Sequence, residues 1–256
     1  MSGPMCDDCF IGVRHEGEPE GKIDQISGVE CYVGTPAGDH DKAKVVLFLS
    51  DVFGIPLVNN KLLVDDFARN GYRAVMPDLF QGEALPENFM SLPPGSFDRE
   101  GWVGRHGPES WTSALDGVVA ALKAEGVTWI ATTGYCFGAP PAWHLALKGD
   151  AQVTVVSHPS RLRNPEDLEE YAQKAKAPLL INSCEEDSSF PAEAQAKADE
   201  ILGNGRFAPG YERTYWPGCK HGFAVRGDMS KPQVKAGKEG SFEATVKFLN
   251  KYKGLP

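Results

Sequence analysis

Short runs of apolar residues alternate along the chain with longer segments in which apolar residues recur every three or four positions. The runs are rich in Val and Ile and predict strands at 43–50, 72–79, 127–133, 153–158, 178–183 and 212–216. The longer segments predict helices at 56–70, about 111–126, 139–148, 165–175, 191–202 and the C-terminus. Because strands that alternate with helices cross over into a mostly parallel sheet, this pattern predicts an α/β fold.

Two of the predicted helices are defined by a continuous apolar face. The first face consists of Trp111, Leu115, Val118, Val119 and Leu122. The second, in the C-terminal helix, consists of Phe242, Val246 and Leu249. Faces with this spacing are typical of helices packed on a sheet, so we expect helices to cover both sides of the sheet.

Two segments depart from the alternation of strands and helices. Residues 22–32 predict one or two antiparallel strands, which would make the sheet mixed at that edge. Residues 80–107 carry several Pro and Gly residues and no sustained period, which predicts a long irregular excursion. Its apolar side chains either wall a binding pocket or pin the excursion to the surface; they are Phe89, Met90, Leu92, Phe97 and Trp102.

The length of 256 residues suits one α/β domain, with residues 1–20 as an N-terminal arm. With 41% apolar and 24% charged residues, the composition is that of a globular protein, and no run of about 18 apolar residues could cross a membrane. The chain starts without the pattern of a secretory or transit signal, so we expect a cytoplasmic protein.

The net charge of −9 opposes binding to nucleic acids and to anionic lipid surfaces. We therefore expect the partner to be a small-molecule substrate, and the protein to be a monomer or a weak homodimer. Six cysteines in a chain of this length predict reduced thiols and not a disulfide framework. Cys6 and Cys9 have the spacing of half a zinc site, but no second pair follows, so we expect no metal.

A sharp turn between a predicted strand and a predicted helix carries the main candidate for chemistry. In the segment Gly134-Tyr-Cys-Phe-Gly138, glycines flank Cys136 two positions away on each side. The nucleophile of an α/β-hydrolase sits on such a turn, because its unusual backbone angles require small flanking residues. The positive end of the following helix would favour the thiolate of Cys136. The alternative is a buried structural cysteine.

A nucleophilic thiol needs a base and an acid that orients the base, and in this fold the acid precedes the histidine. Asp187 follows the predicted strand 178–183, and His221 follows the next one. Glu185 and Glu186 are alternatives to Asp187, which could instead cap a helix. His221 could instead be a solvated loop residue. His158 ends a strand but lacks a preceding acidic loop, and we expect it to line the same edge of the sheet.

Two backbone amides are expected to stabilise a tetrahedral intermediate. In this fold they come from the residue after the nucleophile and from the loop after an early strand, which here are Phe137 and Val52. Asp51 comes just before Val52, and its carboxylate could accept or position the thiol proton. The alternative role for Asp51 is to cap the following helix.

Together, five segments of the sequence resemble the dienelactone hydrolase family. They are Ser50-Asp-Val-Phe-Gly54, Pro77-Asp-Leu-Phe80, Gly134-Tyr-Cys-Phe-Gly138, Glu185-Glu-Asp187 and His221-Gly-Phe223. The resemblance runs from about Gly28 to the C-terminal helix, and the N-terminal Cys-x-x-Cys with His15 is similar to the fungal branch.

The resemblance implies an α/β-hydrolase fold, a triad of Cys136, His221 and Asp187, and neither metal nor cofactor. It further implies hydrolysis of an unsaturated γ-lactone that bears a carboxylate, such as dienelactone, to maleylacetate. Bacterial members of the family have Glu at the position of Asp51, where it holds the thiol proton. Asp is one methylene shorter, which weakens or changes that role.

Bacterial members also hold the substrate carboxylate with two arginines that this chain lacks at the matching positions. Gln81 and Gly82 stand near the first position, and Val225 occupies the second, followed by Arg226. The loss of a bidentate clamp affects the choice of substrate more than the fold. The candidate substrate-binding residues are Tyr135, His158 and Arg226.

Three functions are compatible with these residues. The first is hydrolysis of a small ester or lactone through Cys136. The second is a thioesterase or a general carboxylesterase activity at the same site. The third is a protein that binds a ligand or senses oxidants through Cys136 without turnover.

Overall fold

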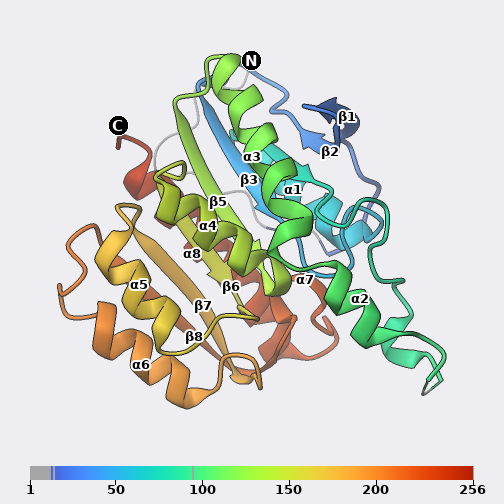
Figure 1. The fold of residues 1–256 in the computed structure, drawn as a ribbon, viewed down its shortest axis with the longest axis vertical. Coiled ribbons are helices and arrows are strands. Elements are labelled where there is room, and N and C mark those ends of the chain that lie inside the picture. Colours follow the sequence, from blue (N-terminus) through green and yellow to red (C-terminus); the bar gives the residue numbers. More distant parts are fainter. Residues whose placement is uncertain (1–12, 14, 94, 256) are drawn as a thin grey trace.

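A single eight-stranded sheet runs through the computed structural model, which describes residues 13, 15–93 and 95–255, without the side chain of Met90 (Figure 1). The strands are β1 (Lys22–Ile26), β2 (Val29–Gly34), β3 (Lys44–Leu49), β4 (Arg73–Pro77), β5 (Trp129–Tyr135), β6 (Val153–Ser157), β7 (Leu179–Glu186) and β8 (Tyr211–Lys220). Their order is β1-β2-β4-β3-β5-β6-β7-β8. β2 pairs antiparallel with both β1 and β4, and all other pairs are parallel, which confirms the predicted mixed edge.

Helices cover both faces of this sheet. They are α1 (Val58–Arg69), α2 (Arg99–Arg105), α3 (Pro108–Ala124), α4 (Ala139–Lys148), α5 (Glu166–Lys174), α6 (Ala192–Leu202), α7 (Phe223–Arg226) and α8 (Pro232–Tyr252), with short 3₁₀ helices η1 (Phe89–Ser91) and η2 (Cys136–Gly138). In Figure 1, α3, α4 and α5 lie in front of the sheet, and α1 and α8 lie behind it. None of the helices in the described residues is long and apolar enough to cross a membrane.

The two apolar helix faces predicted from the sequence are both buried against the sheet. All five apolar residues of the α3 face are buried, as are Phe242, Val246 and Leu249 of α8. On the rear face of the sheet, the ring of Phe242 lies 4.9 Å from that of Phe67 of α1, measured between centroids. Such packing of apolar stripes on both faces buries every residue of the central strand β5.

Two predicted elements are corrected by the structure. The first helix begins at Val58 and not at Pro56, because residues 52–56 form a turn of their own. The side chain of Asn60 donates to the carbonyl of Gly54 and to the carboxylate of Asp51, which holds this turn against the helix.

The excursion at 80–107 is also more regular than its sequence suggests, since it contains η1 and α2. Asp98 caps α2 by accepting a hydrogen bond from the amide of Gly101. With only seven residues, α2 is too short to display a helical period.

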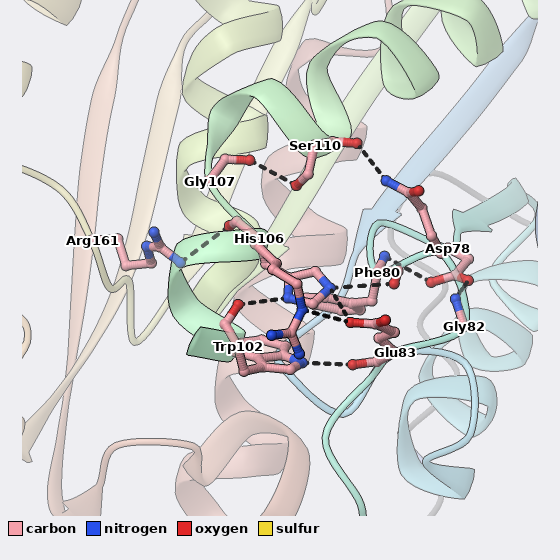
Figure 2. A network of polar contacts seen from close by, with 11 residues as sticks. Asp78, Phe80, Gly82, Glu83, Trp102, His106, Gly107, Ser110 and Arg161 are labelled. Carbon is pink, nitrogen blue, oxygen red and sulfur yellow. Dashed lines mark hydrogen bonds and ion pairs between the residues drawn. The ribbon is translucent and has the colours of Figure 1, made fainter. Parts of the chain in front are cut away.

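The second half of the excursion packs on Phe80 and Phe137 through Trp102, and Figure 2 shows Trp102 beside Phe80. Its indole is buried, stacks on His106 at 4.4 Å between centroids, and donates from Nε1 to the carbonyl of Glu83 at 2.6 Å. The first half is tied down by the amide of Leu85, which donates to the carbonyl of Val52. These contacts favour the prediction that the apolar residues pin the excursion, while its motion as a lid stays a prediction.

The contact between Phe67 and Phe242 generates a prediction about stability. Replacing the buried Phe242 with Ala removes a large apolar surface and leaves a cavity, so we expect the free energy of unfolding to fall by about 3–5 kcal/mol. Urea denaturation followed by fluorescence measures the change. Lys247→Ala, on the exposed side of the same helix, should cost less than about 1 kcal/mol. Equal losses in the two variants would contradict this packing.

Candidate active site

The chemically reactive side chains lie at the carboxyl ends of five neighbouring parallel strands. Cys136, His158, Asp187 and His221 each directly follow a strand, namely β5, β6, β7 and β8, and Asp51 comes two residues after β3. The strand register pairs Tyr135 with Ser157 and Glu186 with Lys220, so these strand ends meet at one edge of the sheet. The sheet topology thus brings together five side chains that are spread over residues 51 to 221 of the sequence.

The turn at Cys136 has the geometry that its two glycines predict. Cys136 adopts a φ of 51°, in the left-handed region that side chains rarely occupy. A Cβ at Gly138 would overlap the carbonyl oxygen of Leu49, and one at Gly134 would collide with the carbonyl of Gly138. The chain continues at once into η2 and α4. Both glycines are therefore required by the close approach of backbone to backbone.

The thiol of Cys136 contacts a serine that the sequence analysis missed. The Sγ atom lies 3.6 Å from Oγ of Ser160, and the amide of Ser160 donates to the carbonyl of Cys136 at 3.1 Å. Cys136 and Ser160 are both buried, at 8% and 9% exposure. The one signal in the sequence is position, because Ser160 follows the strand that pairs with the strand leading to Cys136.

His221 and Asp187 form a direct contact, with 2.9 Å between Nδ1 of the imidazole and Oδ2 of the carboxylate. The imidazole must donate this hydrogen bond, because a carboxylate only accepts, and Nε2 is left for other partners. The other carboxylate oxygen of Asp187 accepts from the amides of Ser189 and Phe190. Asp187 thus contacts the histidine and closes the turn at residues 187–190, but it does not cap α6, whose N-cap is Pro191.

The neighbouring acidic residues serve other partners. Glu185 accepts a hydrogen bond from the amide of Gly218, and Glu186 forms an exposed ion pair with Lys220. Of the three acidic residues considered from the sequence, Asp187 is the one whose carboxylate is described in contact with His221.

The protonated form of His221 is strongly favoured. Burial opposes the charge, but hydrogen bonds with Asp187 and Cys136, together with the negative charges of both groups, outweigh burial and raise the pKa of His221 to about 10. The side chain retains 25% exposure. The site therefore favours an imidazolium beside the carboxylate of Asp187.

His158 and Tyr135 are buried beneath this pair, and their expected role as substrate contacts stays a prediction. Their exposures are 0% and 3%. The ring of His158 packs edge-on against His221 at 5.0 Å and against Phe223 at 5.6 Å between centroids. Burial, with the charges of His221 and Arg226, lowers the pKa of His158 well below its usual value. A neutral imidazole thus supports His221 from inside the fold.

Asp51 is engaged with Arg226, and its expected role toward the thiol proton stays a prediction. Its carboxylate is fully buried and accepts from Nε of Arg226 at 3.0 Å, from the Asn60 side chain and from the Phe53 amide. No contact with Cys136 is described. The guanidinium of Arg226 also lies 4.7 Å above the ring of Phe53. The charges of Asp51 and Arg226 thus neutralise one another.

The two amides predicted to stabilise an oxyanion belong to Phe137, inside the Cys136 turn, and to Val52, in the loop after β3. The Val52 amide lies outside any helix or strand and donates no hydrogen bond to another described residue. Phe137 lies in the first turn of η2, where an amide has no partner within the helix. Both donors are therefore left for a ligand.

A metal site is not evident in the part of the chain that the structure describes. No group of three or more His, Cys, Asp or Glu side chains there is arranged to hold an ion. Cys6 and Cys9, the predicted half-site, lie outside the described residues.

Comparisons with known proteins point to one family. The model of the dienelactone hydrolase family matches residues 29–253. Hydrolase pyvD of Aspergillus violaceofuscus is 33% identical over 245 residues, and hydrolase tropI of Talaromyces stipitatus is 32% identical over 253 residues. Each match covers 95% of this chain and 95% of the relative. Both organisms are fungi, as the resemblance at the N-terminal segment implied.

Among solved structures, a dienelactone hydrolase-like protein from Klebsiella pneumoniae superposes with a TM-score of 0.70. The superposition covers 91% of this chain and 99% of the other, at 16% sequence identity. An identity this low carries information about architecture only. It confirms the predicted α/β-hydrolase fold.

The raised pKa of His221 predicts a specific dependence of stability on pH. In the unfolded chain this pKa is about 6.5, so between about 6.5 and 10 the folded protein holds a proton that the unfolded chain releases. Stability contributed by the charged imidazole is fully present below about pH 6.5 and declines as the pH rises through 10. We expect the difference in free energy of unfolding between the wild type and His221→Gln to shrink from pH 7 to pH 10 in urea denaturation.

Cys136→Ser serves as the control for this pH dependence, since it removes the negative charge that helps to raise the pKa of His221. In that background, the pH range over which the stability difference between proteins with His221 and with His221→Gln declines should be narrower. A difference that stays constant with pH, or grows toward pH 10, would show that His221 is neutral in the folded protein.

The buried pair of Asp51 and Arg226 generates a second prediction. Arg226→Gln leaves a fully buried carboxylate without its counterion and should lower the free energy of unfolding by about 2–4 kcal/mol. Adding Asp51→Asn should restore part of the loss, as a double-mutant cycle in urea measures. Arg105→Gln, which breaks an exposed pair with Glu83, should cost less than about 1 kcal/mol. The engagement of Asp51 would be refuted by equal costs for the two arginine variants.

Proposed function

The chain belongs to the dienelactone hydrolase family, and we propose that it hydrolyses a small ester or lactone through attack of the Cys136 thiolate on the carbonyl carbon. One observation carries the proposal. A cysteine held at a φ of 51° at the start of a helix stands beside a histidine whose pKa both Cys136 and Asp187 raise. A thiol at the start of a helix, with a histidine as its paired base, has the combination that makes a cysteine a nucleophile.

The resting state that this proposal requires is an ion pair between thiolate and imidazolium. His221 holds the proton that Cys136 gives up, and the carboxylate of Asp187 fixes the ring through Nδ1. The hydroxyl of Ser160, 3.6 Å from the sulfur, donates to the thiolate and keeps it oriented. Asp51 takes no part, because its oxygens are occupied by Arg226, Asn60 and Phe53.

In the first half of the reaction, the thiolate adds to the carbonyl and the negative charge moves to oxygen. The amides of Val52 and Phe137 donate to this oxyanion. When the intermediate collapses, the carbon–oxygen bond to the leaving group breaks, and His221 transfers its proton to the departing oxygen. A lactone opens at this step, and a thioester on Cys136 remains.

In the second half, a water molecule attacks the thioester while neutral His221 accepts its proton. Collapse of this second intermediate breaks the carbon–sulfur bond, releases a carboxylic acid and regenerates the thiolate and the imidazolium. Every proton moves between His221, water and the substrate, so this mechanism draws on no cofactor.

The proposed substrate class is a small ester or lactone, and not dienelactone in particular. The position after Pro77-Asp-Leu-Phe80 carries Gln81, whose side chain donates to the carbonyl of Ser110. Arg226 is neutralised by Asp51. The two cations that bacterial relatives use for a substrate carboxylate therefore have no free equivalents at those positions.

Variants of Cys136 test this proposed function. Cys136→Ala should lower kcat/KM for 4-nitrophenyl acetate and for unsaturated γ-lactones by at least about 1,000-fold, because the nucleophile is lost. In the wild type, quenching during turnover should trap an acetyl group on Cys136, detected by mass spectrometry of peptides. Cys31→Ala, which removes another buried thiol on β2, serves as the control and should keep the activity.

The same assay separates the alternatives. Faster turnover of acyl-thioesters than of lactones would favour a thioesterase. Hydrolysis that survives in Cys136→Ala, or no hydrolysis together with reversible oxidation of Cys136 by peroxide, would refute the proposed function.

A further inference from the structure

Arg161 is a cation beside the reactive sulfur that the proposed reaction does not use. Its guanidinium carbon lies 5.1 Å from the centre of the Phe137 ring, next to Cys136 in the chain. Arg161 is an exposed residue, the partial burial of its guanidinium lowers its pKa, and the proximity of Cys136 opposes this effect. The side chain therefore lies close to the reacting centre, on the side of the residue whose amide is a proposed oxyanion donor.

The charge of Arg161 differs from that of its neighbours in having no counterion. Arg226 is paired with buried Asp51, and Arg163, two residues farther along the same loop, is paired with Asp167. No carboxylate lies within 4.0 Å of Arg161 in residues 13, 15–93 and 95–255. One nitrogen donates to the carbonyl of His106 at 3.3 Å, and the other guanidinium donors have no described protein acceptor. A guanidinium in this state is available to an anion.

The backbone holds Arg161 in this position. His158 and Arg161 adopt φ values of 39° and 60°, and between them the amide of Ser160 donates to the carbonyl of Cys136. Strained angles of this kind persist only where the surrounding contacts enforce them. The loop is therefore fixed on the Cys136 turn, and the direction of the arginine is set by that turn.

The partner of Arg161 on the excursion is equally well braced (Figure 2). The ring of His106 stacks on Trp102, with Nδ1 2.7 Å from the carbonyl of Trp102 and Nε2 3.3 Å from that of Phe80. The ring of Phe80 in turn packs on Phe137 at 4.9 Å. His106, the residue after α2, therefore holds its backbone carbonyl in a fixed position, where it accepts a hydrogen bond from Arg161.

Resting on the proposed function, we propose that Arg161 binds an anionic group of the substrate and makes the enzyme prefer esters that carry a carboxylate near the bond to be cleaved. The guanidinium adds specificity and takes no part in proton transfer. In this proposal Arg161, in the loop after β6, binds the anion, whereas Arg226 stabilises the fold through its ion pair with Asp51.

Two pairs of substrates that differ in charge test this role of Arg161. They are 3- and 4-acetoxybenzoate and their methyl esters, which release the same acetyl group. We expect the wild type to prefer the carboxylates, and Arg161→Gln to lower the ratio of kcat/KM for anionic over neutral ester by about 10-fold or more, mainly through KM. Arg161→Lys should restore part of the ratio. Arg163→Gln, the matched control on the same loop, should leave the ratio unchanged.

A binding readout separates failure of this inference from failure of the proposed function. Benzoate should protect Cys136 of the wild type from alkylation by iodoacetamide, whereas benzamide and the Arg161→Gln background should show no such protection. An unchanged ratio in Arg161→Gln, or equal protection by benzoate in both proteins, would overturn the anion role even if Cys136 is the nucleophile. Protection by benzoate without any hydrolysis would support the anion role and refute the proposed function.

Discussion

The close approach of Gly138 to the carbonyl of Leu49 is the constraint on which the rest of the site depends. It allows the chain to leave β5 and enter α4 within a few residues, and it forces Cys136 into the left-handed region. In that conformation the side chain faces the end of the sheet, where loops from β6, β7 and β8 also end. A larger residue at Gly138 would separate the turn from β3 and move the thiol away from His221. The chemistry thus rests on a contact between two backbones.

The sequence predicted the fold and the main residues of the site because both follow from local rules. Apolar periods identified the sheet and the covering helices, and the order of acid and histidine after the glycine-flanked cysteine identified Asp187 and His221. The short helix α2 was missed because seven residues carry no period. The sequence also did not reveal how deeply side chains at the strand ends are buried, since Tyr135 and His158 face the interior.

Contacts between distant segments were the other part that the sequence could not provide. The pair of Asp51 and Arg226 joins residues 175 positions apart, so neither residue alone revealed that its charge was already balanced. Ser160 and Arg161 belong to no motif, and they reach the candidate site only because their loop folds onto the Cys136 turn. Together, Asp51 and Arg226 form one buried ion pair that stabilises the fold.

The order of the strands also has a consequence for how the protein is made. During synthesis, Cys136 leaves the ribosome well before His221, which follows the edge strand β8, and before Arg226, which neutralises Asp51. Parallel strands with distant partners form late, because the chain must first close long loops. The growing chain therefore carries a thiol without its base until its last part emerges. In the proposed mechanism, Cys136 becomes reactive only when β8 has joined the sheet and His221 stands beside it.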